Sequence, residues 1–104
     1  MVFFDPDSVE LSVPDWRTIT QASFDYRSAP RKIVVTGHAA LAEHDRMALS
    51  LRRAGTVMQG LMKTGCPPDA ITMLGYGDGR PLIPGDKGAQ EMQNRRVEIV
   101  LLVS

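Results

Sequence analysis

The sequence has little of several residue types, and each shortage excludes a class of protein. A single cysteine, Cys66, among 104 residues excludes an intramolecular disulfide and a thiol-rich metal site. The sequence has no run of eighteen apolar residues, which is about the length that a membrane-spanning helix needs. Twelve basic residues balance twelve acidic ones, so the chain lacks the surplus positive charge that a nucleic-acid clamp needs. With 43% hydrophobic and 23% charged residues, the chain is predicted to fold as one domain over residues 1–104.

The first residues also lack the basic region and the long apolar stretch of a secretory signal. The protein is therefore expected to be cytoplasmic, or its targeting segment belongs to a longer parent chain.

Hydrophobic patterning predicts an α/β (α+β) domain with the element order strand, helix, strand, helix, strand, loop, strand. The predicted strands cover residues 2–4, 32–36, 71–74 and 96–103. The first helix begins at Ser12, whose hydroxyl can cap it, and ends near Tyr26. Its inward face is predicted to hold Trp16, Ile19, Ser23 and Tyr26. This order implies a mixed four-stranded sheet with a helix layer on one face.

The second helix carries the clearest periodic signal in the chain. Apolar residues recur at intervals of four, three, four and three, at Met47, Leu51, Ala54, Met58 and Leu61. The arginines of this segment, Arg46, Arg52 and Arg53, fall off that stripe. Gly65 is placed to take a left-handed conformation after the helix, and Cys66 is expected to fold back onto the helix end as a small packed hydrophobe.

The remaining motifs each have an ordinary structural interpretation beside a functional one. Arg52 and Arg53 are typical of a solvated helix face. Residues 75–79 (GYGDG) lack the spacing of a phosphate-binding signature and indicate a turn-rich loop. His38 and His44, near two acids, do not have the spacing of a metal site. Because no nucleophile, base or metal constellation emerges, the residues alone name no function and do not indicate an enzyme.

Five blocks, taken together, resemble the OmpA-like C-terminal domain family, the peptidoglycan-binding module of outer-membrane porins, peptidoglycan-associated lipoproteins and flagellar stator proteins. The blocks are FFDPDSVEL (3–11), VVTGHA (34–39), LSLRRA (49–54), GYGDGRPL (75–82) and NRRVEI (94–99). They occur in the family's order and at close to its spacing. The resemblance implies a βαβαββ two-layer sandwich and a groove that holds the diaminopimelate residue of the peptidoglycan stem peptide without a cofactor, a metal or covalent chemistry.

The resemblance also implies which residues form the groove. The arginine of the LSxxRA motif, here Arg53, would bind a ligand carboxylate, because a guanidinium grips carboxylates in a bidentate way. Asp5 matches a position that lines the groove, and Leu49 and Asn94 match positions at the groove or supporting it. Arg52 occupies a variable motif position and is expected to remain on the surface.

The sequence departs from the family where an acid should hold the ligand ammonium. The family reads Gly-His-Thr/Ala-Asp, whereas this chain has Ala40 in the last position. The interval from His38 to Leu49 is about two residues shorter than in the family, and Arg46 stands where the family has a groove asparagine. Losing one hydrogen-bonded charge costs about 1.5–3 kcal/mol, or roughly tenfold to over a hundredfold in affinity. Asp45 or Glu43 could supply a replacement carboxylate.

Two hypotheses follow from the match and the departure. The chain is a non-catalytic module that anchors an envelope protein or the outer membrane to peptidoglycan, or it is a degenerate domain that serves protein interaction or scaffolding. Its expected partners are peptidoglycan and other envelope proteins, with no nucleic acid and no membrane contact by the domain itself. The family's domain begins with a block like residues 2–7, so Met1 is expected to start an excised module whose parent supplied targeting to the periplasm.

Overall fold

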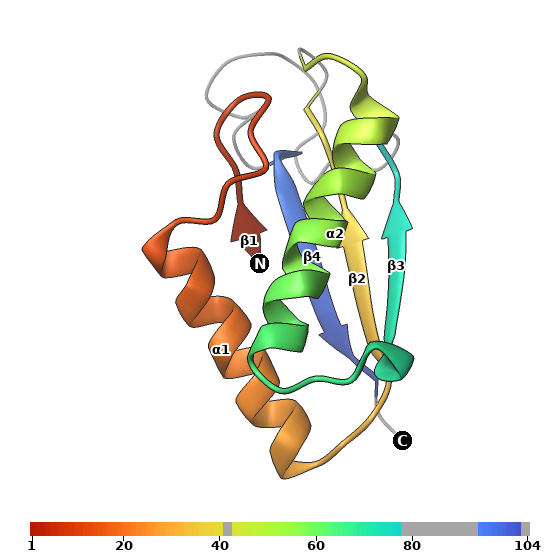
Figure 1. Cartoon of the computed structure of the whole chain (residues 1–104). Helices are drawn as coiled ribbons and strands as arrows, with labels where there is room; N and C mark the ends of the chain where they lie inside the picture. The colour runs from red at the N-terminus through yellow and green to blue at the C-terminus, as the bar shows by residue number, and fades with distance from the viewer. Residues whose placement is uncertain (41–42, 78–93, 103–104) are drawn as a thin grey trace.

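The computed structural model describes residues 1–40, 43–77 and 94–102. Figure 1 shows two helices lying over one face of a sheet, as the order of elements predicts. In chain order the elements are β1 (Val2–Phe3), α1 (Val13–Ser28), β2 (Ile33–Gly37), α2 (Arg46–Lys63), the short 3₁₀ helix η1 (Pro68–Ala70), β3 (Ile71–Gly75) and β4 (Arg96–Leu101). The predicted elements are thus confirmed within one or two residues at most ends. The predictions at positions 78–82 and 103 lie outside the described residues.

The sheet is mixed and four-stranded, with the order β1-β4-β2-β3. β2 pairs in parallel with β3, and β4 lies antiparallel between β2 and β1. Ile33, Val35 and Gly37 share the helix-facing side of β2, and register places Val97 of β4 opposite Gly37. The two-layer sandwich predicted from the patterning is therefore confirmed.

Helix α1 begins at a complete capping box. The backbone N–H of Asp15 donates to Ser12 Oγ at 3.3 Å, and the N–H of Ser12 donates back to Asp15 Oδ2 at 2.8 Å. Ile19 and Ser23 are buried under the helix, while Trp16 and Tyr26 are partly buried against the core. The inward face predicted for this helix is confirmed.

Helix α2 buries the predicted stripe in its second half but not in its first. Ala54, Val57 and Leu61 are fully buried in the core, but Met47 and Leu51 are 54% and 40% exposed, so their predicted burial is wrong. The first half of the helix instead buries a more polar set, Leu49, Ser50 and Arg53. Arg53 was expected off the buried stripe and is 0% exposed.

Gly37 explains why the first half of α2 turns this face toward the sheet. A Cβ built on Gly37 would lie 1.8 Å from the Ser50 carbonyl oxygen, so only glycine permits the helix backbone to approach β2 this closely. Ser50 Oγ also accepts a hydrogen bond from the N–H of Gly77 at 2.9 Å. This approach carries Arg53 over the carboxyl end of β2.

The carboxyl end of α2 closes as predicted. The N–H groups of Cys66 and Gly65 donate to the carbonyls of Leu61 and Met62, at 2.9 and 3.3 Å, which is a Schellman motif. Gly65 has φ +117°, and Cys66 is buried in the core beside the helix end. Among the residues that the structure describes, no helix has the length and hydropathy needed to span a membrane.

Candidate functional site

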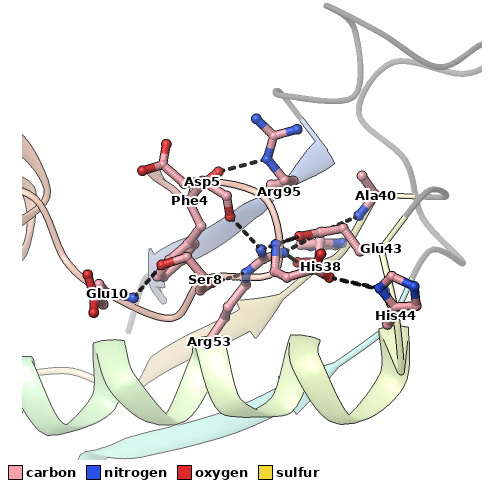
Figure 2. A network of polar contacts seen from close by, with 11 residues as sticks. Phe4, Asp5, Ser8, Glu10, His38, Ala40, Glu43, His44, Arg53 and Arg95 are labelled. Atoms are coloured by element: carbon pink, nitrogen blue, oxygen red, sulfur yellow. Dashed lines mark hydrogen bonds and ion pairs between the residues drawn. The ribbon is translucent and has the colours of Figure 1, made fainter.

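Arg53 lies at the centre of a polar network at the carboxyl end of β2 (Figure 2). Its Nη1 and Nη2 donate to Oε1 and Oε2 of Glu43 at 2.7 and 2.5 Å, a bidentate ion pair. Its Nε donates to the carbonyl of Ser8 at 2.9 Å. Nη1 and Nη2 donate further to the carbonyls of His38 and Asp5, at 3.2 and 3.1 Å. The guanidinium therefore joins α2 to the loop after β1 and to the end of β2.

Glu43 is held as completely as its partner. Besides the two bonds from Arg53, its Oε1 accepts the backbone N–H of Ala40 at 2.8 Å, and its Oε2 accepts that of Asp7 at 2.6 Å. The N–H of Glu43 also donates to the carbonyl of Ala40 at 3.0 Å. Glu43 thus brings a carboxylate back to position 40, where the sequence has alanine.

The Arg53–Glu43 pair is buried, with side-chain exposures of 0% and 4%. Burial by itself raises the pKa of Glu43, but the hydrogen bonds from Arg53, Ala40 and Asp7 and the charge of Arg53 outweigh it and leave the pKa below its ordinary value. The carboxylate is therefore ionised at neutral pH, and the pair carries two full charges away from water.

Phe4 lies beneath the guanidinium. The Cζ of Arg53 is 5.1 Å from the centre of the Phe4 ring, and the ring is only 3% exposed. At that distance the ring face attracts the cation. Arg95 reaches the same segment from the start of β4, where its Nε donates to the carbonyl of Phe4 at 2.8 Å. The aromatic ring and the ion pair together fix the residues that follow β1.

The acids predicted for the site lie at its edge. Asp5 contributes its backbone carbonyl to Arg53, while its carboxylate is exposed and points away from the guanidinium in Figure 2. Asp45 is the exposed N-cap residue of α2, in the left-handed conformation with φ 47°. Of the two replacement acids suggested by the sequence, Glu43 rather than Asp45 contacts Arg53. A direct ligand contact by Asp5 or Asp45 stays a prediction.

The other predicted positions are mostly buried. Leu49 is 1% exposed and Asn94 is 7% exposed, so each lies under the surface of the site rather than on it. Arg52 is exposed, as expected for the variable motif position. The ligand roles assigned to Leu49 and Asn94 stay predictions.

His38 belongs to a second polar cluster behind the Arg53–Glu43 pair. It is 3% exposed, and its Nε2 lies 3.4 Å from Oε2 of Glu98, which also accepts from Nε of Arg96 at 2.9 Å. The centroid of the His38 ring lies 5.8 Å from the centroid of the Tyr76 ring. Within the described ranges, no three His, Cys, Asp or Glu side chains gather where they could hold a metal.

A hollow of about 560 Å³ lies away from this network. Its lining includes Tyr26, Pro30, Pro67 and Leu102 and contains none of the residues that contact Arg53. It therefore offers a ligand none of the charged groups of the site.

The sequence as a whole matches a known family. The sequence profile of the OmpA family matches residues 3–95. The chain belongs to the OmpA family. A protein of Gluconacetobacter diazotrophicus named "Outer membrane protein" is 34% identical over 97% of this chain and 29% of its own length. The "Peptidoglycan-associated lipoprotein" of Pseudomonas aeruginosa is 31% identical over 93% of this chain and 59% of its own length.

Solved structures agree with this assignment. The crystal structure of the peptidoglycan-associated lipoprotein from Burkholderia pseudomallei superposes with a TM-score of 0.90 at 26% identity, and the match covers 97% of this chain and 88% of that one. The OmpA-family chain described here spans less than two thirds of the length of the two sequence relatives.

This OmpA-family site can recognise charge but shows no apparatus for covalent chemistry among the described residues. It holds one buried ion pair, Arg53–Glu43, with the exposed Asp5 and Asp7 on the neighbouring loop segment and the cationic Arg95 bonded to that segment. Sequence reasoning placed Arg53 here but offered Glu43 only as an alternative, and it missed Ser8, Phe4 and Asp7. Both Phe4 and Ser8 lie in the first family block. The aromatic residue Phe4, directly before the loop, was the available sequence signal for the cation–π contact.

Proposed function

We propose that this OmpA-family domain is a non-catalytic module that binds peptidoglycan and anchors an envelope protein to the cell wall. The observation that carries the proposal is the return of a carboxylate to position 40 by Glu43, beside Arg53. A pocket for diaminopimelate needs a cation for a carboxylate and an acid for an ammonium. The Arg53–Glu43 pair supplies both groups, although the acid comes from a different position.

The relatives support the same proposal. One is named a peptidoglycan-associated lipoprotein, and another is named an outer membrane protein. We infer that the domain faces the periplasm within a larger envelope protein. In this arrangement Arg53 binds a carboxylate of the stem peptide and Glu43 holds its ammonium, while Asp5 lies at the rim.

A second candidate function is a degenerate domain that serves protein interaction. The observation in its favour is that the guanidinium of Arg53 is fully buried and bonded within the chain, so it presents no open face to a ligand. The two candidates predict opposite results with purified cell walls.

Sedimentation with purified sacculi tests the proposal. The domain is expected to pellet with sacculi in a saturable way, and Arg53→Lys is expected to lose roughly tenfold to a hundredfold in affinity because a lysine cannot grip a carboxylate in a bidentate way. Arg52→Ala is the matched control, since Arg52 is the exposed neighbour on the same helix. Circular dichroism confirms that each variant is folded.

Three outcomes would contradict parts of this proposal. A domain that stays in the supernatant at every concentration, while Ala40→Asp pellets, would favour the degenerate candidate. Failure of both to pellet would refute peptidoglycan binding at this site. Equal pelleting by Arg53→Lys and the unmodified domain would exclude Arg53 as the anchor.

A further inference from the structure

Every hydrogen-bond donor of Arg53 is used within the chain. A guanidinium side chain has five N–H donors, and the five bonds of Arg53 go to two carboxylate oxygens and three backbone carbonyls. The two bonds to Glu43 occupy the Nη1–Nη2 edge, one of the edges at which a guanidinium grips a carboxylate, and Nε is already bonded to the carbonyl of Ser8. A ligand carboxylate can therefore reach this edge only by taking the place of Glu43.

The acceptors of Glu43 are used as completely. Each of its oxygens accepts one bond from Arg53 and one backbone N–H, from Ala40 or Asp7. A carboxylate has about four lone-pair sites, so none is left over for a ligand ammonium. If a ligand separates Arg53 from Glu43, Glu43 keeps its two backbone donors but loses its only cationic partner among the described residues.

We propose that Glu43 acts as an internal carboxylate that closes Arg53, so that the site admits only a ligand that carries a carboxylate and an ammonium group together. This inference rests on the proposed function, because it describes how the same site selects its ligand. The ligand exchanges one buried ion pair for two: its carboxylate replaces Glu43 on Arg53, and its ammonium replaces Arg53 on Glu43.

The burial of the pair makes the exchange selective. A ligand with only a carboxylate would leave Glu43 buried without a cation, and a ligand with only an ammonium would leave Arg53 without an anion. Breaking a buried pair from one side is strongly unfavourable, so one-signed ligands are expected to bind at least about a hundredfold more weakly than a ligand of both signs.

The rim of the site adds to this selection. The carboxylate of Asp5 is exposed, and the side chain of Asp7 is 50% exposed, where its Oδ1 lies 3.7 Å from Nδ1 of the exposed His44. These two exposed acids outnumber the one arginine, Arg95, that is bonded to the same segment, so the charge beside the pair favours an ammonium group over a lone anion. The ammonium end of a zwitterion is thus favoured to arrive first, beside Glu43.

Calorimetric titration with three linear probes tests the inference on the intact domain. Diaminopimelate carries both signs, pimelate carries only carboxylates, and cadaverine carries only ammonium groups. The unmodified domain is expected to bind diaminopimelate at least about a hundredfold more tightly than either one-signed probe. Glu43→Ala is expected to gain pimelate binding and to lose affinity for diaminopimelate. Equal binding of pimelate by both proteins would overturn the inference.

Acetate provides a second test, which can be read even if the Glu43→Ala variant is less stable. If Glu43→Ala exposes an unpaired guanidinium, acetate should raise its melting temperature in a concentration-dependent way, with chloride at equal ionic strength as the control. The unmodified domain and the double variant Glu43→Ala/Arg53→Met should show no such rise. A Glu43→Ala variant that acetate does not stabilise would overturn the inference, and so would an equal rise in the unmodified domain.

These results separate the inference from the proposed function. Pelleting with sacculi together with equal pimelate binding by both proteins would leave the function standing and refute the role of Glu43. Acetate rescue without pelleting would confirm that Glu43 closes Arg53 and refute peptidoglycan binding.

Discussion

Ala40 and Glu43 are joined by two reciprocal hydrogen bonds: the Ala40 N–H donates to Glu43 Oε1 at 2.8 Å, and the Glu43 N–H donates to the Ala40 carbonyl at 3.0 Å. These bonds hold the longer side chain of Glu43 against the backbone of Ala40. An acid three residues further along therefore occupies the space beside Arg53. Under the proposed function, this acid takes the part that the family motif gives to position 40.

Glu43→Ala is expected to lower the free energy of unfolding by about 3–5 kcal/mol, because it leaves the buried Arg53 cation without its anion. The exposed Glu10, in the loop after β1, is the control acid, and Glu10→Ala should change stability by no more than about 0.5 kcal/mol. Urea denaturation measures both. Equal losses in the two variants would show that the pair contributes no more than a surface acid.

Stability is expected to fall at acid pH through Glu43. Its pKa in the folded chain is below the ordinary value of 4.5, so the ionised form is favoured by folding. The contribution is fully present above pH 4.5 and is lost as the pH falls through the lowered pKa. Urea denaturation across this range should show a smaller acid loss for Glu43→Gln, which cannot titrate. Parallel pH profiles for the two proteins would contradict the assignment.

Gly37→Ala is expected to destabilise the domain by about 3 kcal/mol or more. The added Cβ would meet the Ser50 carbonyl at 1.8 Å, and a helix backbone cannot yield as a side chain can. Gly55→Ala is the control on α2, since its Cβ would meet only Met73 Sδ at 3.7 Å, and it should stabilise by up to about 1 kcal/mol. Thermal unfolding compares them, and a neutral Gly37→Ala would refute the close approach.

Ser12→Ala is expected to cost about 1 kcal/mol, because it removes the side-chain acceptor of the α1 capping box. Thr18→Ala, on the exposed side of the first turns, is the control and should leave stability unchanged or raise it by up to about 0.5 kcal/mol. Chemical denaturation distinguishes the two. A Ser12→Ala variant as stable as the control would mean that Asp15 alone caps the helix.

Local patterns predicted most of the fold because they depend on neighbouring residues. The cap at Ser12 and the Schellman motif at Gly65 each require only a short stretch of chain. The buried face of α2 was harder to predict. Its first half is set by the contact between Gly37 and Ser50, which are distant in sequence, and a count of apolar residues assigns no place inside to a charged side chain.

The site was predictable in part for the same reason. The family motif identified Arg53, but the partner depended on the path of the chain between β2 and α2. That path uses left-handed backbone at Asp45, φ 47°, and the facing loop uses it at Asp7, φ 54°. Such conformations are uncommon for residues other than glycine, so the sequence did not distinguish Glu43 from Asp45 as the partner of Arg53.

The two backbone amides that donate to Glu43 allow the opening of the Arg53–Glu43 pair to be measured by hydrogen exchange. The amide hydrogens of Asp7 and Ala40 can exchange with solvent deuterium only when their bonds to the carboxylate open. Their isotope exchange therefore times the opening of the pair directly, without any ligand. Exchange at these two positions would report whether Asp7, in the loop after β1, and Ala40, after β2, release Glu43 together or in sequence.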